Sequence, residues 1–234
     1  MAFRHGKDTV VFGDDAALTG QLNQFSATRS QQVVSTNVFG TSDQEFIAGM
    51  YESSLSVNGL WEAATSDTEL WGHATANVIL PVTVGHGDTL GNRAILFNGF
   101  LDDYSIQGPV NDAVRLSATF TGSAATRLGV NLHPLGAETT TGAESSVDQG
   151  ASSANGGVAN LHVTAFTGTD CTIKIQDSAN DADWADLITF TTVSGVTSER
   201  ATVTGTVDQY VRVNITAGTF SSVTFAVAFA RNWD

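Results

Sequence analysis

Residues 51–62 read YESSLSVNGLWE, and the pattern of this stretch decides the fold class. Apolar side chains recur at alternate positions, with Tyr51, Leu55, Val57 and Trp61 on one side of an extended chain. Because side chains point alternately to opposite faces of a β-strand, this spacing predicts a strand with one face on a core. The opposite face is mostly polar and consists of Glu52, Ser54, Ser56, Asn58, Leu60 and Glu62. A half-buried strand of this kind indicates a mainly β protein.

The segments around this stretch predict further strands and one helix. Residues 22–36 read as a long, mostly polar strand, and residues 37–49 as a loop that leads into the quoted stretch. Behind it, Ser66 and Glu69 fit the S-x-x-E capping box, which predicts a helix over about residues 67–76. Gly is frequent at 23 residues and Pro is rare at 3, a composition typical of strands and tight turns.

A change in composition divides the chain. Residues 137–157 are rich in Gly, Ser, Thr and Ala, and they predict a linker or a long loop. From residue 158 onward, strand-like segments recur at intervals of about ten residues, which is typical of an antiparallel β-sandwich. We therefore expect a β domain with one helix at residues 1–136 and a second, C-terminal β-sandwich domain at residues 158–234.

The net charge is strongly negative, at −14 from 10 Lys and Arg against 24 Asp and Glu. The part before Gly136 has 6 basic and 13 acidic residues and the part after it has 4 and 11, so each contributes −7. Such a surface repels phosphates and offers no cluster of basic residues to bind them. We therefore do not expect an ordinary DNA-binding protein.

The sequence predicts no catalytic, cofactor-binding or metal-ligating residue. It contains no H-E-x-x-H helix, no G-x-S-x-G elbow and no phosphate-binding Gly loop before a helix. Residues 177–186 are dense in oxygen ligands but lack EF-hand spacing, so we favour a connection between strands and keep calcium as the alternative. The single cysteine, Cys171, lies in an apolar alternating run typical of buried positions. We predict that the chain is not an enzyme and has no cofactor.

Three segments resemble the major tail tube proteins of long-tailed bacteriophages. The first is MAFRHGKDTVVFGD at residues 1–14, and the second is FGTSDQEFIAGMYESSLSVNGLWE at residues 39–62. The third is the late hydrophobic part, with WADLITFTTV at residues 184–193 and YVRVNITAGTFSSVTFAVAFARN at residues 210–232. Together they cover about half of the chain, and their order and character carry the resemblance.

The resemblance implies a tail tube core, an antiparallel β-sandwich or barrel with one flanking α-helix. Subunits of this family form hexameric rings that stack into a hollow tube, and the other partners would be tape measure, tail terminator and baseplate proteins. The tube would be assembled in the host cytoplasm and belong to the virion tail. Phage DNA would pass through an acidic bore without specific binding, which agrees with the charge of the chain. No apolar run approaches membrane-spanning length, so no membrane partner is expected.

Two sets of residues become candidates within this interpretation. The polar face of the quoted stretch is a candidate wall of the bore, through Glu52, Ser54, Ser56, Asn58 and Glu62. The preceding segment supplies candidate ring-to-ring contacts, namely Phe39, Phe46 and Ile47. In the alternative interpretation, the same polar face simply meets solvent.

Two other classes of protein share these sequence features. A capsid-decorating or head–tail joining virion protein would have the same composition and the same β content. A carbohydrate-binding β-sandwich module would use exposed aromatic rings as a stacking platform. The candidates for such a platform are Trp61, Trp71, Trp184 and Trp233.

Overall fold

The computed structural model describes residues 6–39, 42–76 and 78–232, without the side chains of residues 65 and 66. The predicted mainly β fold is confirmed, because the paired strands in these ranges are antiparallel and build one large open sheet. Helix α1, Thr68–Ala76, confirms the helix prediction and follows a π-helical turn at Ala63–Asp67. The Ser66 side chain of the capping box and Trp233 lie outside the described residues. No helix in the described ranges is long and apolar enough to span a membrane.

The described N-terminal strands form one continuous antiparallel layer. Its order is β3-β4-β7-β6-β5-β1-β2, and the stretch YESSLSVNGLWE lies mostly in β4, between β3 and β7. The bounds are β1 Val10–Gly13, β2 Ala16–Ala17, β3 Leu22–Ser35, β4 Phe46–Leu60, β5 Leu80–Gly85, β6 Arg93–Gln107 and β7 Arg115–Gly122.

One face of this layer forms the N-terminal core with helix α1. Leu55 and Val57 of β4 are 0% and 1% exposed, and they share a cluster with Leu70 of α1. Trp71 of α1 meets Tyr104 of β6 edge-on, with ring centroids 6.0 Å apart. The apolar and polar positions that alternate along β4 therefore correspond to its core face and its outer face.

The buried part of β4 is shorter than the alternation predicts. Tyr51 and Trp61, assigned to the core face from the sequence, are 60% and 37% exposed. Strand β4 pairs with β7 only from Ser54 to Leu60, so Tyr51 lies beyond the layer and Trp61 follows the last pair. The predicted loop at residues 37–49 is also shorter, because β4 already begins at Phe46.

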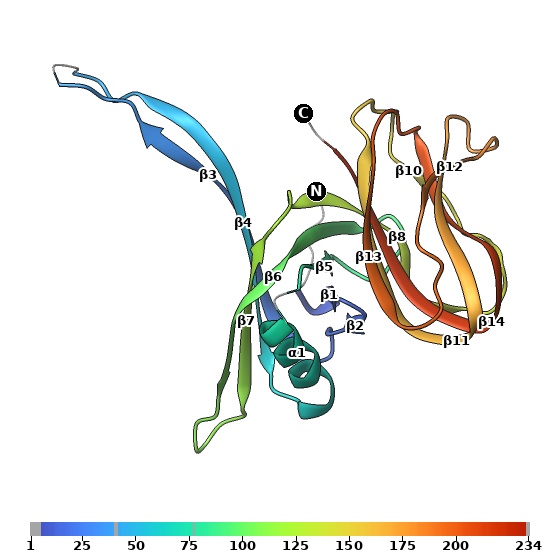
Figure 1. Ribbon diagram of the computed structural model, residues 1–234, viewed down its shortest axis with the longest axis horizontal. Helices are drawn as coiled ribbons and strands as arrows, with labels where there is room; N and C mark the ends of the chain where they lie inside the picture. Colours follow the sequence, from blue (N-terminus) through green and yellow to red (C-terminus); the bar gives the residue numbers. More distant parts are fainter. Residues whose placement is uncertain (1–5, 40–41, 77, 233–234) are drawn as a thin grey trace.

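The C-terminal part is built around a long antiparallel ribbon, coloured gold to red in Figure 1. Strands β11, Gly157–Ser178, and β14, Tyr210–Arg231, pair along almost their whole lengths. Side chains from both ends of the ribbon meet in one core, as Leu161 and Ile175 of β11 show. Further strands flank this ribbon: β8 Arg127–Glu138 pairs with β14, while β12 Ala185–Thr189 and β13 Thr197–Val203 pair with β11.

Residues 137–157, predicted as a linker or long loop, run along β14. Two short strands, β9 Gly142–Ala143 and β10 Val147–Asp148, pair with β14 within residues 210–215. Val147 packs against the C-terminal core. The division of the chain into two domains at this segment stays a prediction.

The two parts meet through a shared sheet and a buried polar network. Strand β6 pairs with β8 from Arg93 to Leu96, which makes the sheet continuous. The fully buried Asn160 of β11 donates from Nδ2 to the Val82 carbonyl at 3.3 Å and to the Thr83 hydroxyl at 3.2 Å. A small apolar cluster surrounds the junction and consists of Ala94, Leu96, Val158, Ala228 and Ala230.

Candidate functional site

The outer parts of β3 and β4 form a two-stranded ribbon that projects from the body of the molecule (Figure 1). β3 pairs with β4 from Leu22 to Ser35, and among the described strands it has no other partner. β7 supports β4 only as far as Ser54. Residues 29–35 and 46–53 therefore lie beyond the end of β7 and form only a two-stranded segment. We call this segment the β3–β4 ribbon.

The β3–β4 ribbon exposes large apolar side chains on both faces. Val34 pairs with Ile47, while their neighbours Val33 and Phe46 point to the opposite side. More than half of the surface of each of these side chains is exposed, as it is for Met50. A two-stranded ribbon is only marginally stable in water by itself, and exposed apolar patches of this kind mark interaction sites.

The structure places all three predicted ring-to-ring residues in this projection. Phe46 and Ile47 lie on the β3–β4 ribbon and are 56% and 61% exposed, and Phe39 lies near its tip, fully exposed. Val33, Val34 and Met50 belong to the same apolar surface and were missed. Val33 and Val34 in β3 and Met50 in β4 lie far apart in the sequence, and the strand pairing brings them together.

The outer face of β3, β4, β7 and β6 is a polar surface. Cross-strand pairing aligns its side chains in rows, because paired residues share one face of a sheet. The rows are Thr28-Ser54-Thr121, then Ser26-Ser56-Thr119-Asp103, then Gln24-Asn58-Ser117-Ser105. Within these rows Asp103 is the charged residue, while Phe100 extends the first row and Arg115 lies next to Ser117 on the same side of β7. The face therefore consists mainly of hydroxyl and amide groups, with Phe100 and Arg115 at its margins.

Hydrogen bonds run along the rows of this polar face. The Thr28 and Ser54 hydroxyl oxygens are 2.7 Å apart, and those of Ser56 and Thr119 are 3.3 Å apart. The Thr121 hydroxyl donates to Asp102 at 2.8 Å, which adds a second carboxylate next to the rows. Such bonds hold the side chains in place and leave part of each polar group open to the surface.

The structure brings together three of the five predicted bore residues. Ser54, Ser56 and Asn58 lie side by side in the polar face. Glu52 lies further out, on the β3–β4 ribbon, and accepts a hydrogen bond from Gln32. Glu62 lies beyond the strand, where its carboxylate accepts the Ala64 backbone N–H at 2.9 Å. Whether any of them lines a bore stays a prediction.

Sequence reasoning missed the β6 and β7 residues of the polar face. The alternation in RLSATFTG at residues 115–122 places Ser117, Thr119 and Thr121 on one side. That signal was present in the sequence. Their position next to Ser54 and Ser56 follows from strand order, which the sequence does not specify.

A cluster of carboxylates surrounds His73 where the β1–β2 turn meets α1. His73 Nε2 lies 3.3 Å from Asp14 Oδ2 and 3.9 Å from Glu69 Oε2. Burial raises the pKa of Asp15, and the neighbouring Asp14 charge raises it further. Burial also raises the pKa of Glu69, with the Asp15 charge acting in the same direction. These contacts join the turn to the helix.

The aspartate-rich segment at residues 177–186 bonds largely within the protein. The Asn180 side-chain oxygen accepts the Ala182 and Asp183 backbone N–H groups at 3.0 and 2.9 Å. Asp186 accepts from Lys174 at 2.6 Å, and Asp177 accepts the Asp208 backbone N–H at 2.8 Å. These bonds favour the strand connection over a calcium site.

The described tryptophans lie on three separate elements. Trp61 follows β4, Trp71 belongs to α1, and Trp184 precedes β12. The Arg212 guanidinium lies 3.9 Å from the centre of the Trp184 ring and covers one of its faces. This arrangement does not favour a stacking platform for a sugar.

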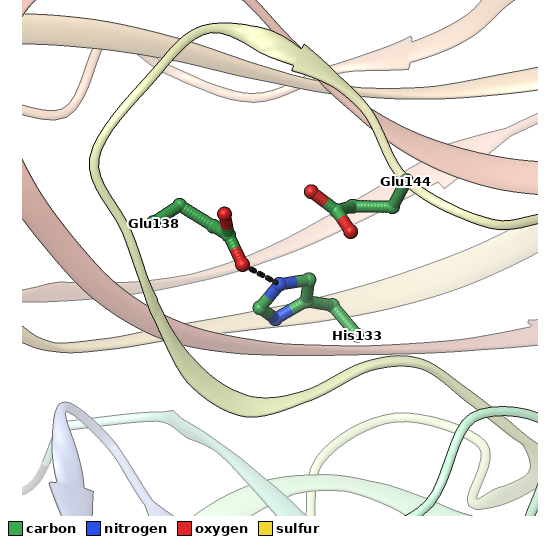
Figure 2. Close-up of side chains that lie close together, drawn as sticks. All are labelled: His133, Glu138 and Glu144. Carbon is green, nitrogen blue, oxygen red and sulfur yellow. Dashed lines mark hydrogen bonds and ion pairs between the residues drawn. The ribbon is translucent and has the colours of Figure 1, made fainter.

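One group of side chains in the described residues has the composition and spacing of a metal site. His133 and Glu138 of β8 and Glu144 after β9 bring three ligand atoms within 4.8 Å of one another (Figure 2). The sequence alone did not indicate this group. Alternation places His133 and Glu138 on opposite faces of a regular strand, but β8 has an irregular register between His133 and Gly136.

Comparison with known proteins gives structural matches. No protein-family model and no curated protein matches the sequence. The structure is similar to a chain in the tail of an empty gene transfer agent particle with C6 symmetry, with a TM-score of 0.43, 15% identity, and coverage of 53% of this chain and 97% of that one. It is also similar to the SPP1 tail tube protein, with a TM-score of 0.43, 10% identity, and coverage of 52% and 77%.

A further match is SPP1 Dit, a hub protein of phages that infect Gram-positive hosts. Its TM-score is 0.39 with 11% identity, and the alignment covers 96% of this chain and 99% of that one. Tail tube proteins, the class that the sequence resembles, are therefore among the structural neighbours, together with a hub protein.

Proposed function

We propose that this chain is the major tail tube subunit of a phage-like particle, which assembles into stacked hexameric rings around an acidic bore. The observation that carries the proposal is the β3–β4 ribbon. It projects beyond the layer, pairs with no third strand of the described residues, and exposes apolar side chains on both faces. A projection of this composition is stabilised by a partner, and another copy of the same chain is the partner that a tube supplies.

Ring formation needs two different surfaces on each subunit, since head-to-tail contacts close a ring. The β3 edge and the apolar faces of the β3–β4 ribbon offer one such surface. Pairing of the β3 edge with a neighbouring chain would satisfy its free backbone groups. Phe39, Phe46 and Ile47 would then contact the adjacent ring.

The bore is proposed to be lined by the polar face of β3, β4, β7 and β6. Its rows of hydroxyl and amide groups include Asp103, and Asp102 lies beside them. Arg115 also lies on this face next to Ser117, but its guanidinium is 3.1 Å from the Asp112 carboxylate. Phosphates passing such a wall are repelled by the net charge of −14. DNA would move along this wall without a deep binding site in which to stall.

Negative-stain electron microscopy of the purified full-length chain tests the proposal. We expect hollow filaments of uniform bore from the native chain, and none from the double variant Phe46→Ser and Ile47→Ser. Val196→Ser is the matched control, because Val196 is 56% exposed and lies far along the chain from the ribbon. A native chain that stays monomeric at high concentration would contradict the proposal.

A further inference from the structure

We propose that His133, Glu138 and Glu144 bind one divalent transition-metal ion, with Zn²⁺ as the ion that fits the ligand set best. The proposal is independent of the tail tube function. It concerns the place where the chain leaves β8 and crosses to β9. Figure 2 shows the two glutamate carboxylates turned toward the imidazole from either side of this crossing.

The distances suit a metal ion with short bonds. His133 Nε2 lies 3.4 Å from Glu138 Oε1, and the ligand atoms of all three residues lie within 4.8 Å of one another. Zinc bonds to nitrogen and oxygen of roughly 2.0–2.1 Å give a tetrahedral ligand-to-ligand distance of roughly 3.3 Å. The His133–Glu138 pair already has that spacing. Glu144 reaches it by a change in its own side-chain torsions, for which its partial exposure leaves room.

The imidazole is fixed in the orientation that a metal ligand needs. His133 Nδ1 lies 3.2 Å from the Phe225 carbonyl oxygen, and a carbonyl only accepts, so Nδ1 holds the proton and donates it. The ring is 6% exposed and stacks on the Phe225 ring at 4.0 Å between centroids. In the neutral ring, Nε2 then presents a lone pair to the carboxylates. Metal-ligating histidines typically have this arrangement, with the second nitrogen bonded to a carbonyl.

The charges favour a divalent cation over a proton. A lone pair on Nε2 and a carboxylate oxygen repel each other at 3.4 Å unless a positive charge lies between or beside them. A proton on Nε2 would balance one of the two carboxylates, whereas a divalent ion balances both. Imidazole together with carboxylate suits zinc and its neighbours, while calcium and magnesium prefer shells of oxygen ligands.

The ion would brace a short crossing in the chain. Glu138 pairs with Val223 of β14, and Gly142 pairs with Ile215 of the same strand. Residues 139–141 therefore span the same distance as residues 216–222 of β14. His133 and Glu138 lie before this crossing and Glu144 lies directly after it. One ion bound to all three would hold the two sides of the crossing together and stabilise the folded state.

Zinc titration of the full-length, metal-free chain at about pH 7.5 tests the proposal, since the imidazole must be neutral to bind. We expect one zinc ion per chain by calorimetry. We also expect the melting temperature to rise by roughly 5–10 °C when free zinc exceeds the Kd about a hundredfold. Magnesium at the same concentration should leave the melting temperature unchanged.

Two variants and one control make the test specific. His133→Gln and Glu144→Gln should each weaken zinc binding by at least about tenfold. Glu144→Gln leaves the buried ring in place, so it reports on binding even if His133→Gln folds poorly. His73→Gln is the matched control, because His73 is also contacted by two carboxylates and should leave the titration unchanged. Absence of zinc binding, or binding that survives Glu144→Gln unchanged, would overturn the proposal.

Discussion

His162 of β11 and Thr83 of β5 are joined by a buried hydrogen bond of 2.8 Å between Nε2 and the hydroxyl oxygen. The other ring nitrogen, Nδ1, lies 2.5 Å from the Asp14 carbonyl oxygen and therefore donates to it. The neutral imidazole satisfies both contacts at once. This one side chain links the C-terminal ribbon to the N-terminal layer and to the turn between β1 and β2.

The stability of the fold should fall in mild acid because of His162. Burial lowers its pKa from 6.5 to about 4, against the smaller opposing effect of Asp14. The unfolded chain therefore binds a proton at a higher pH than the folded chain. The stabilisation is complete above pH 6.5 and is lost as the pH falls toward 4, by up to about 3 kcal/mol.

Urea unfolding at a series of pH values measures this effect. Between pH 6.5 and pH 4, the native chain should lose stability more steeply than the variant His162→Gln, which has no titrating group at position 162. The carboxylates and the other four histidines are the same in both chains, so the difference between the two curves isolates His162. Parallel curves would show that the residue titrates normally.

The side chain of Asn160 should contribute more to the free energy of unfolding than the side chain of a surface asparagine. Its side chain donates to Val82 and Thr83, and its oxygen accepts from Arg200 at 3.2 Å. Burial lowers the pKa of Arg200 to about 10, so loss of this acceptor leaves a desolvated cation with fewer partners. Asn160→Ala should cost about 2–3 kcal/mol of unfolding free energy in urea denaturation. The exposed Asn155→Ala is the control and should change it by less than about 0.5 kcal/mol.

Neighbouring positions in β4 should respond very differently to truncation. Leu55 is 0% exposed within the N-terminal core, and Leu55→Ala should cost about 2–5 kcal/mol. Ser56 faces outward and makes one hydroxyl contact of 3.3 Å, so Ser56→Ala should cost less than about 1 kcal/mol. Thermal unfolding of the two variants checks the assignment of the faces, and comparable losses would show that it is wrong.

Positive charge on the polar face should convert assembled tubes into DNA binders. Ser56→Lys together with Asp103→Lys places ammonium groups in one row of that face. Co-sedimentation of filaments with short duplex DNA should then show binding that weakens steeply with salt. Val196→Lys together with Asp183→Lys, at two exposed positions of the C-terminal part, adds the same charge of +3 and is the control for added charge alone. If the control bound DNA with the same affinity as the polar-face variant, the result would contradict a bore lined by the polar face.

The sequence predicts local structure well where alternation and burial coincide. Leu55 and Val57 show this agreement, because their alternation in β4 matches their burial in the core. The helix at 67–76 corresponds to α1 because the capping box marks its start, and the mostly polar strand at 22–36 corresponds to the largely exposed β3. Tyr51 shows the limit of that reasoning. Its spacing matches the core face, but its strand has already left the layer, and the Arg29 guanidinium at 4.4 Å is its partner.

Candidate sites depend on strand order and register, which the sequence does not carry. Ser54 and Ser56 were identified from one strand, whereas Thr119 and Asp103 joined them only through pairing across β7 and β6. The His133 and Glu138 pair was hidden by the irregular register in β8. A single inserted residue reverses which side chains share a face, and nothing in local composition announces it.

The continuity of β4 has a mechanical consequence. From Phe46 to Leu60 it is one strand, and its inner part is hydrogen-bonded to β3 on one side and to β7 on the other. Hydrogen bonds in antiparallel ladders run perpendicular to the strands, so tension along β4 loads them in shear and they resist together. A force applied at the outer tip is therefore transmitted along β4 directly to the N-terminal core.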